Sequence, residues 1–315
     1  MKIPEFLQIA IDEITEDISL KELSSFSKDL TFRYREGVKK DYMGQRGHKL
    51  AYLASRFPAT FAAVYKALET LPSVDIESVA DVGAGPGTAT WASLCIFGGV
   101  NKFTLYEKDK ELIELGKLLI EKAEHPVPAF WKEVDLTKDF VIEEADLVLM
   151  SYAIGEVPSS FWPVILDKLW QKTGKFLVII EPGTPLGFER IRRLREMLLS
   201  KGAHVVAPCP HGKKCPMEGS DWCHFSARLE RSSKHRYVKE ASLGYEDEKF
   251  SYIAVSKGPI ALEKGERILR HPLKNPGHIL LTLCTDEGLL TRTVTKKDKE
   301  AYTQARKADW GDFLK

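Results

Sequence analysis

Three glycines at alternate positions, preceded by an acidic residue, form the pattern best suited to bind a ligand. Asp81 is followed by Gly83, Gly85 and Gly87, between a short apolar run and an apolar segment of helical character. Glycines allow a tight turn with positive φ and let the backbone approach a ligand closely. The free N–H groups at the start of the next helix can then contact polar or anionic ligand atoms.

The spacing of these glycines separates two kinds of nucleotide site. A dinucleotide-binding loop has the spacing G-x-G-x-x-G, whereas residues 81–87 have the spacing D-x-G-x-G-x-G. The latter resembles motif I of class I S-adenosylmethionine (SAM) methyltransferases, in which the acidic residue lies near the methionine part of the cofactor. This resemblance implies SAM binding by Asp81 and the three glycines. A glycine turn without a ligand is the alternative.

Further carboxylates follow the next predicted strands. Glu107 ends the strand 102–107, at the distance of about 20 residues where a carboxylate can accept hydrogen bonds from both ribose hydroxyls. Asp135 follows the strand 129–134 and could lie near the adenine. Glu156 follows a fourth strand and is a weaker candidate. Each of these three could instead be a surface or turn residue.

The elements around these residues indicate an α/β fold. Apolar runs that read as strands alternate with helical segments, at lengths that favour a parallel sheet. Residues 1–74 have the apolar spacing of helices. We predict a class I SAM-methyltransferase fold, Rossmann-like and mostly parallel, with an N-terminal helical region and a cysteine-containing insertion. The predicted divisions are 1–74 (helical), 75–203 (SAM-binding core), 204–248 (insertion) and 249–315 (strands that complete the sheet, and a tail helix).

A second group of reactive residues lies in the insertion. Cys209, Cys215 and Cys223 have the spacing C-x5-C-x7-C, wider than the C-x2–4-C pairs that zinc sites prefer. An iron–sulfur cluster usually needs four thiolates, and Cys284 is the remaining cysteine outside the predicted core. A [4Fe–4S] cluster on these four is one interpretation. The alternatives are zinc, completed by His211 or His224, and cysteines without metal; Cys95 reads as a small buried hydrophobe.

The length and composition of the chain limit its domain number, its membrane association and its expected compartment. With 315 residues, 43% of them hydrophobic, the chain can form one large domain or two modest ones. No apolar run approaches the roughly 20 residues that span a membrane. Five acidic residues within positions 1–17 argue against a targeting peptide, and cysteines without a signal peptide favour a reducing compartment. We therefore expect a cytoplasmic protein; the oligomeric state stays unknown.

Charge is more informative locally than globally, because the net charge is only +1. Residues 187–240 contain 12 Lys and Arg against 6 Asp and Glu. Nucleic-acid phosphates are one expected partner of such a region, and a solvated face is the alternative. The helix predicted in it carries Arg190, Arg192, Arg193 and Arg195. A second basic and aromatic stretch contains Phe32, Arg33, Tyr34, Arg35, Lys39, Lys40, Tyr42 and Arg46.

The cysteine motifs resemble a known family. Together with the glycine loop, the chain is similar to the methyltransferase-like family that assembles the mitochondrial small ribosomal subunit, and to its bacterial relatives. The similarity runs from about Arg46 to the tail. It implies a class I methyltransferase fold, a four-cysteine iron–sulfur site and binding to small-subunit ribosomal RNA or the assembling small ribosomal subunit. The motifs are Pro208-Cys209-Pro210-His211, Cys215-Pro216, Trp222-Cys223-His224-Phe225, Arg270-His271-Pro272 and Gly277-His278.

The methyl acceptor is not evident from the sequence. Amino-nitrogen methyltransferases place Asn/Asp-Pro-Pro-aromatic after the fourth strand, whereas this chain has Ser151-Tyr152-Ala153-Ile154. Tyr152 could stack on a base or be a packed aromatic, and no catalytic residue is identified. An RNA methyltransferase with a structural cluster and a non-catalytic assembly factor both remain. A small-molecule methyltransferase is less favoured because of the basic region.

Overall fold

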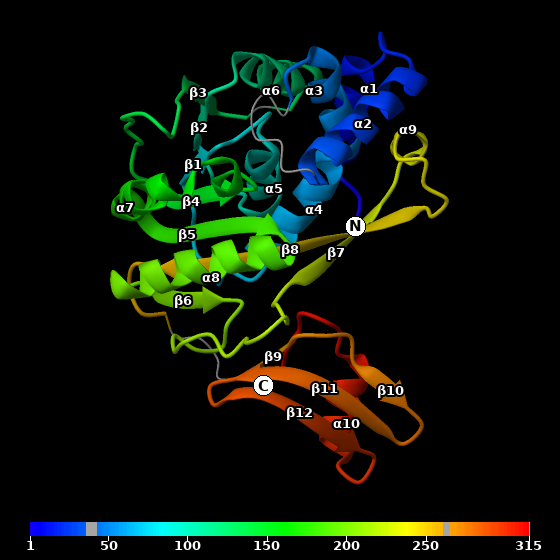
Figure 1. Ribbon diagram of the computed structural model, residues 1–315, viewed down its shortest axis with the longest axis vertical. Coiled ribbons are helices and arrows are strands. Elements are labelled where there is room, and N and C mark those ends of the chain that lie inside the picture. The colour runs from blue at the N-terminus through cyan, green and yellow to red at the C-terminus, as the bar shows by residue number, and fades with distance from the viewer. Residues whose placement is uncertain (36–42, 126, 261–264, 315) are drawn as a thin grey trace.

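The computed structural model describes residues 1–35, 43–125, 127–260 and 265–314 (Figure 1). Its N-terminal region is helical, as the apolar spacing predicted. The helices are α1 (Glu5–Ile14), α2 (Leu20–Arg35), α3 (Arg46–Ser55) and α4 (Phe57–Leu68). Lys39, Lys40 and Tyr42 of the predicted basic stretch lie outside the described residues.

The main sheet has the strand order β3-β2-β1-β4-β5-β8-β6. Strands β1 to β5 are parallel, and β8 runs antiparallel to both β5 and β6. This order with one reversed strand is the class I SAM-methyltransferase arrangement, so the predicted fold class is confirmed. The strands are β1 (Ser78–Val82), β2 (Lys102–Glu107), β3 (Ala129–Glu133), β4 (Ala145–Ser151), β5 (Thr173–Pro182), β6 (His204–Ala207) and β8 (Tyr245–Ser256), and β7 (Phe225–Glu230) pairs with the first half of β8.

Helices cover both faces of this sheet. Successive residues of a strand point to opposite faces, so each strand contributes side chains to two cores. On β1, Val79 joins the core that contains α4, α5 and α6, whereas Ala80 and Val82 join the core that contains α7 and α8. Burial on both faces explains why the parallel strands read as continuous apolar runs. The added helices are α5 (Thr88–Ile96), α6 (Lys110–Lys122), α7 (Trp162–Gln171) and α8 (Pro185–Ser200).

The C-terminal region differs from the expectation that its strands complete the main sheet. Only β8 does so; the later strands form a second sheet, with the order β10-β11-β9-β13 and β12 beside β11. On β11, Ile279, Leu281 and Leu283 pack in the core below α10, while the alternate residues His278, Leu280 and Thr282 are half-exposed. Such a one-sided strand does not fit inside a sheet covered on both faces. The elements are β9 (Glu266–Ile268), β10 (Leu273–Asn275), β11 (His278–Thr285), β12 (Gly288–Thr295), α10 (Lys299–Lys307) and β13 (Phe313–Leu314).

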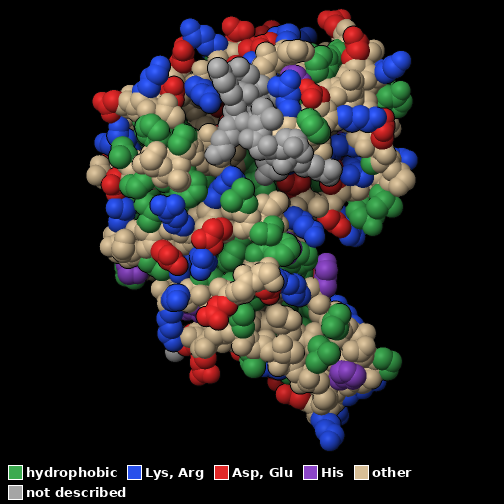
Figure 2. All heavy atoms as spheres, viewed as in Figure 1, with side chains coloured by type: hydrophobic (Ala, Val, Ile, Leu, Met, Phe, Trp, Pro, Cys, Tyr) green, Lys and Arg blue, Asp and Glu red, His purple; other side chains and the backbone are tan. Residues whose placement is uncertain are grey.

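The second sheet and α10 form a smaller lobe beside the main one (Figure 2). The insertion supplies β6 and β7 of the main sheet and the short helix α9 (Ser233–Val238), and its cysteine loop lies between the two lobes. Helix α9 packs against α2, so the insertion also reaches the N-terminal helices. Within the described ranges, no helix is long and apolar enough to cross a membrane.

Candidate functional site

The glycine loop has the conformation that its sequence predicted. Gly83, Gly85 and Gly87 have φ values of 75°, 55° and 87°, a region that side chains disfavour. A Cβ atom on Gly83 would stand 2.4 Å from the Cβ of Ala153, whereas a Cβ on Gly85 would meet nothing within 4 Å. The backbone is therefore tightly packed at the first glycine and open at the second, where a ligand can approach it.

Asp81, at the end of β1, is fully buried beneath this loop. Its Oδ2 accepts hydrogen bonds from the backbone N–H of Thr90 at 3.2 Å and from the Thr90 hydroxyl at 3.0 Å. Its Oδ1 has no partner among the described residues. Burial raises the pKa of Asp81 to about 7, although the Thr90 hydrogen bonds oppose the shift. A donor or cation brought by a ligand would favour the ionised carboxylate.

Glu107 ends β2 and holds the glycine loop in place. Its Oε2 accepts the N–H of Gly85 at 2.9 Å, and its Oε1 accepts those of Lys108 and Asp109 at 2.8 and 2.9 Å. A carboxylate offers about four lone-pair positions, so three backbone donors leave room for about one more. Binding both ribose hydroxyls would therefore require one of these backbone donors to move.

Asp135, the residue predicted near the adenine, caps its own turn. Its Oδ1 accepts the N–H of Thr137 at 2.9 Å and the Thr137 hydroxyl at 2.7 Å, and these bonds lower the pKa of Asp135. The residue of β3 that does contact the loop is Trp131. A Cβ on Gly87 would lie 3.7 Å from its ring, and one on Gly116 would lie 2.4 Å away. The sequence analysis did not identify Trp131; the available signal was a large aromatic residue on the predicted strand 129–134.

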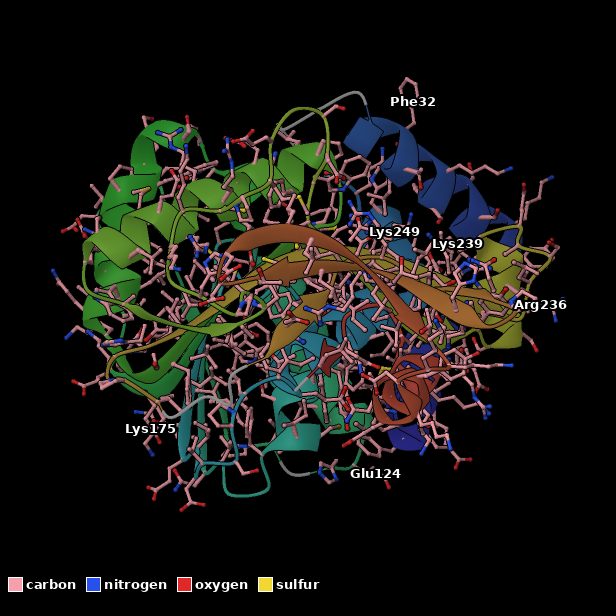
Figure 3. The ribbon with its side chains drawn as sticks, turned by 90° about the horizontal axis from the view of Figure 1, so that it is seen from below. Phe32, Glu124, Lys175, Arg236, Lys239 and Lys249 are labelled. Carbon is pink, nitrogen blue, oxygen red and sulfur yellow. The ribbon has the colours of Figure 1, made fainter. Side chains whose placement is uncertain are left out.

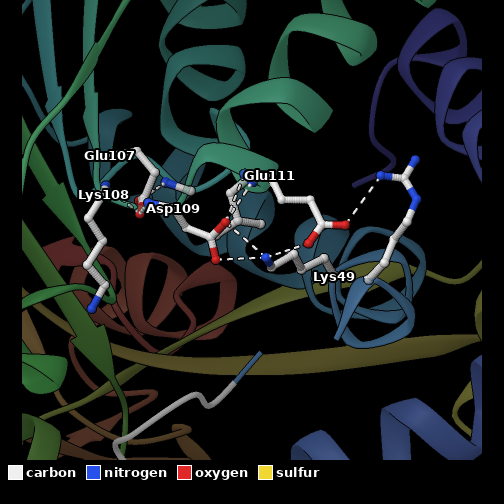
Figure 4. A network of polar contacts seen from close by, with 8 residues as sticks. Lys49, Glu107, Lys108, Asp109 and Glu111 are labelled. Atoms are coloured by element: carbon white, nitrogen blue, oxygen red, sulfur yellow. Dashed lines mark hydrogen bonds and ion pairs between the residues drawn. The ribbon is translucent and has the colours of Figure 1, made fainter. Parts of the chain in front are cut away.

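A buried lysine that sequence reasoning missed joins the N-terminal helices to this site (Figure 4). Lys49 on α3 is 5% exposed, and its Nζ donates to Asp109 at 2.9 Å and to Glu111 at 2.7 Å. Asp109 also caps α6 by accepting the N–H of Glu111 at 2.9 Å. Asp109 follows Glu107 and Lys108 in the chain. Through the Lys49–Asp109 hydrogen bond, α3 therefore helps to position Glu107, the predicted acceptor for the ribose hydroxyls.

Acidic side chains also gather where β4, β5 and β8 meet. Tyr152 has a φ of 56°, rare for a residue with a side chain, and its hydroxyl donates to Glu248 at 3.1 Å. Glu181 pairs with Arg190 at 2.8 Å. Desolvation by the surrounding protein, and then the like charges of Glu107 and Glu181, raise the pKa of Glu156 to about 7, although water still reaches its side chain. The Tyr152 hydroxyl is thus engaged within the protein.

The four predicted cluster ligands line one cavity of about 40 Å³ between the two lobes. Cys209, Cys215 and Cys223 come from the insertion and Cys284 from β11. Burial and the nearby thiols raise the pKa of Cys284 to about 12 and that of Cys223 well above its ordinary value. The folded chain therefore gathers four sulfur atoms around a shared space. Apolar side chains complete the wall, among them Phe188, Met217, Leu269 and Leu289.

Backbone carbonyls next to these cysteines are held by side chains of the surrounding elements. Arg195, buried on α8, donates to the carbonyls of His211 at 2.9 Å and Lys213 at 2.7 Å. The loop is thus fixed between Cys209 and Cys215. The remaining bonds run from Arg267 to the carbonyl of Pro208 at 2.8 Å, from Arg270 to that of Trp222 at 3.1 Å, and from Ser251 to that of Cys223 at 2.8 Å.

The two histidines of the zinc alternative lie differently. His211 approaches Cys284, with its Nε2 3.8 Å from the sulfur. The ring of His224 packs between Trp222 and Trp310, with centroid distances of 5.1 and 4.8 Å. Within the described residues, no group of three or more His, Cys, Asp or Glu side chains stands close enough to hold one metal ion. The iron–sulfur site and the zinc site therefore both stay predictions. The observation in their favour is that the four cysteines line one cavity.

One expectation about a cysteine needs correction, and one about the α8 arginines stays a prediction. Cys95 is exposed at the end of α5 rather than buried. Arg190 binds the buried Glu181, Arg192 binds Glu189 at 2.7 Å near the surface, and the exposed Arg193 lies over the ring of Trp162 at 5.4 Å. Partly exposed ion pairs are weak, so phosphate binding by Arg192 and Arg193 stays a prediction.

The strand order and the glycine loop define the class: a protein with the class I SAM-methyltransferase fold. The particular family follows from the sequence comparison. The family described as "Mitochondrial small ribosomal subunit Rsm22" matches residues 46–315, and the chain belongs to it.

Curated relatives of the chain are named as ribosome assembly or Rsm22 proteins. The human protein "Ribosome assembly protein METTL17, mitochondrial" is 28% identical over 291 residues, covering 85% of this chain and 62% of that protein. "Rsm22-cox11 tandem protein 2, mitochondrial" of Schizosaccharomyces pombe is 28% identical over 333 residues, covering 84% and 43%. The chain thus spans less than two thirds of the length of either relative.

Solved methyltransferase structures are similar to part of the chain at low sequence identity. Magnesium protoporphyrin IX methyltransferase from Synechocystis, with bound S-adenosylhomocysteine, has a TM-score of 0.41 at 11% identity over 63% of this chain and 82% of that one. A putative RNA methyltransferase from Pyrococcus horikoshii has a TM-score of 0.41 at 17% identity, covering 69% and 85%.

The expected cytoplasmic location is contradicted, because the family and these curated relatives are mitochondrial by description. The expectation depended partly on acidic residues near the N-terminus. Two of these residues form ion pairs within the fold: Asp12 pairs with Lys234 at 3.0 Å, and Glu13 pairs with Lys122 at 3.3 Å. Acidic residues of a helix that packs on the domain are therefore a poor guide to the compartment.

Proposed function

We propose that this protein binds SAM and small-subunit ribosomal RNA during assembly of the small ribosomal subunit, and that Cys209, Cys215, Cys223 and Cys284 hold a structural [4Fe–4S] cluster. The observation that carries the proposal is that Cys284 of β11 meets the three cysteines of the insertion at one cavity, although it lies far from them in sequence, in a chain of the ribosome-assembly family. The human relative's name supports the ribosomal partner.

The fit of the cysteines to a cluster is chemical as well as spatial. Burial, and then the neighbouring thiols, raise the pKa of Cys284 and Cys223, so four ionised sulfurs would be unfavourable here without a cation. A bound iron–sulfur group would supply the compensating positive charge and crosslink its ligands. This chain provides the fixed carbonyls and the apolar wall. The cluster would join the insertion to β11, and hence the smaller lobe to the larger one.

The fit to SAM depends on the open side of the glycine loop. Gly85 faces unfilled space, Asp81 keeps one buried oxygen without a partner in the described chain, and Glu107 retains capacity for a further donor. SAM carries a sulfonium and an ammonium group, which suit a buried carboxylate. We therefore assign Asp81, Gly83, Gly85, Gly87 and Glu107 to the SAM site. Asp135 is a further candidate, whose carboxylate already accepts two hydrogen bonds from Thr137 in its own turn.

The binding proposal is tested by two titrations of the same protein. Calorimetry with SAM should show one site. Binding to transcribed small-subunit ribosomal RNA should weaken steeply with salt, by a slope of about 0.7 to 0.9 per phosphate contact. Absence of SAM binding would remove the cofactor assignment, and a salt-independent RNA affinity would remove the phosphate contacts.

A non-catalytic assembly factor is the second candidate, and one observation favours it. Tyr152 stands where amino-nitrogen methyltransferases hold their acceptor, yet its hydroxyl is bound to Glu248 at 3.1 Å. Transfer of tritium from labelled SAM to immature small subunits separates the two roles. A Gly85→Arg variant is the control, since a long side chain at positive φ would fill the open side of the loop. Label above this control supports an enzyme, and label equal to it supports the assembly factor.

A further inference from the structure

A groove of about 730 Å³ runs between α2 and α9, segments separated by some two hundred positions of sequence. Its walls carry three cations, Lys21, Lys28 and Arg236, and one carboxylate, Glu240. The hydroxyls of Ser24, Ser25, Ser233 and Tyr237 also line it. Cations interspersed with hydroxyl donors suit a chain of phosphates and sugars.

The α2 wall of the groove is one continuous stripe of the helix. Lys21, Ser25 and Lys28 follow one another at spacings of four and three and are exposed, so they share one face. Phe32 continues the stripe one turn further and is 62% exposed. Figure 3 shows Phe32 on α2 and Arg236 on α9 pointing away from the body of the protein.

The α9 wall adds a second exposed aromatic ring. Tyr237 is 53% exposed although it borders the groove. Exposed aromatic rings beside cations are the usual features of sites for single-stranded nucleic acid, because unpaired bases stack on the rings while cations contact the backbone. A double helix hides its base faces and could not use Tyr237 or Phe32 in this way.

Glu240 is the one groove residue that opposes an anion. It pairs with Lys28 at 2.6 Å, and the Ser24 hydroxyl donates to it at 3.5 Å. Both partners of the ion pair are more than half exposed, so the pair is weak. An incoming phosphate can therefore take Lys28 from Glu240, at some cost in affinity.

We propose that the α2–α9 groove binds a single-stranded segment of RNA, with Lys21, Lys28 and Arg236 on its phosphates and with Tyr237 and Phe32 stacked on its bases. The inference rests on the proposed RNA-binding function and assigns a surface and a strand state to it. It differs from a groove for an acidic protein segment, which would use the same cations without the rings.

The test measures affinity for an oligouridine strand, for a matched RNA hairpin and for transcribed small-subunit ribosomal RNA. Wild-type protein should prefer the single strand to the hairpin. Exchange of Lys21, Lys28 and Arg236 for Gln should weaken binding and lower the salt slope by about 2. Tyr237→Ala should cost roughly five- to 150-fold in affinity, whereas Glu240→Gln should tighten binding.

Matched variants separate these effects from net charge and surface area. Lys66, Lys117 and Lys122 are exposed on α4 and α6, so exchanging them for Gln changes the charge equally. Phe130→Ala removes an aromatic ring of similar exposure, 58%, from β3. Both controls should keep wild-type affinity, and thermal unfolding should show every variant folded.

Three outcomes would overturn the groove assignment, and one would overturn the proposed function instead. The groove is wrong if wild-type protein binds ribosomal RNA while the groove variants bind it equally well, or if the hairpin binds as tightly as the single strand. Displacement of wild-type binding by polyglutamate but not by oligouridine would indicate a protein partner. Failure of the wild-type protein to bind any of the RNAs would contradict the proposed function itself.

Discussion

Glu107 shows how one side chain serves both fold and site. Its carboxylate accepts three backbone N–H groups that set the glycine loop and the start of α6, and it is the predicted acceptor for the ribose. The spacing from the glycine loop was enough to find it in the sequence. Its backbone partners could not be predicted, because they depend on how β1 and β2 lie side by side.

Glu107→Ala should lower SAM affinity at least tenfold, because hydrogen bonds to a charged group contribute about 1.5–3 kcal/mol. Isothermal calorimetry measures it. Glu133→Ala is the matched control, since Glu133 ends β3 directly opposite Glu107 in register. Equal SAM affinity in the Glu107 and Glu133 variants would remove Glu107 from the site.

Asp81 gives a prediction about pH. Its pKa is about 7 in the folded chain against an ordinary value of 3.8, so the folded state holds the proton more tightly than the unfolded state. The free energy of unfolding should therefore fall by a few kcal/mol as pH rises from about 4 to about 7, and then stay level. Asp81→Asn, whose amide oxygen can still accept from Thr90, should lose this part of the slope. Urea denaturation at pH 5 and pH 8 measures the difference, and parallel profiles for the two proteins would contradict it.

At the scale of elements, most of the regular structure could be predicted. Apolar runs and glycine positions located β1 to β5, and alternation located β11, which carries Cys284. The second sheet could not be predicted as separate, because strand pairing depends on contacts between distant segments. The role of Arg195 was equally hidden: charge alone suggested a basic surface, whereas burial and two carbonyl acceptors make it a support for the cysteine loop.

Arg195→Met should therefore loosen the cysteine loop. It leaves two partly buried carbonyls without their donor, at a cost of about 1–3 kcal/mol of stability. Chemical denaturation should show the loss, and limited proteolysis should cut between residues 209 and 223. Arg193→Met, on the same helix but exposed and outside the cavity lining, should change neither. A variant at 195 as stable and as protease-resistant as the one at 193 would show that Arg195 does not support the loop.

At the scale of the whole molecule, the cysteine cavity lies where the two lobes meet. The contacts across this boundary are hydrogen bonds, such as that from Trp310 to the carbonyl of His224 at 3.0 Å, and packing around Cys284. Family similarity suggested a shared ligand set from the sequence, but only the fold brings β11 to the insertion. A cluster at this point would link β11 of the smaller lobe to the cysteine loop of the insertion.

Removal of iron should therefore loosen the segments that carry the cysteines before it affects the main sheet. In chelator-treated protein, hydrogen exchange should rise in the segment 209–223 and in β11, while β1 to β5 stay protected, because the main sheet has its own two cores. Mass spectrometry of the exchanged peptides measures this. A uniform rise across the main sheet would indicate global unfolding rather than a joint between lobes.

The most direct test of the central claim compares the iron content of Cys284→Ser and Cys95→Ser in protein purified without oxygen. Cys284 lines the shared cavity, whereas Cys95 is exposed on α5, so the two changes are chemically identical and differ only in place. The account predicts wild-type protein with about four iron atoms and a visible absorption band, the same in Cys95→Ser, and strongly reduced iron in Cys284→Ser. Full iron loading in Cys284→Ser, or stoichiometric zinc in place of iron in the wild type, would contradict it.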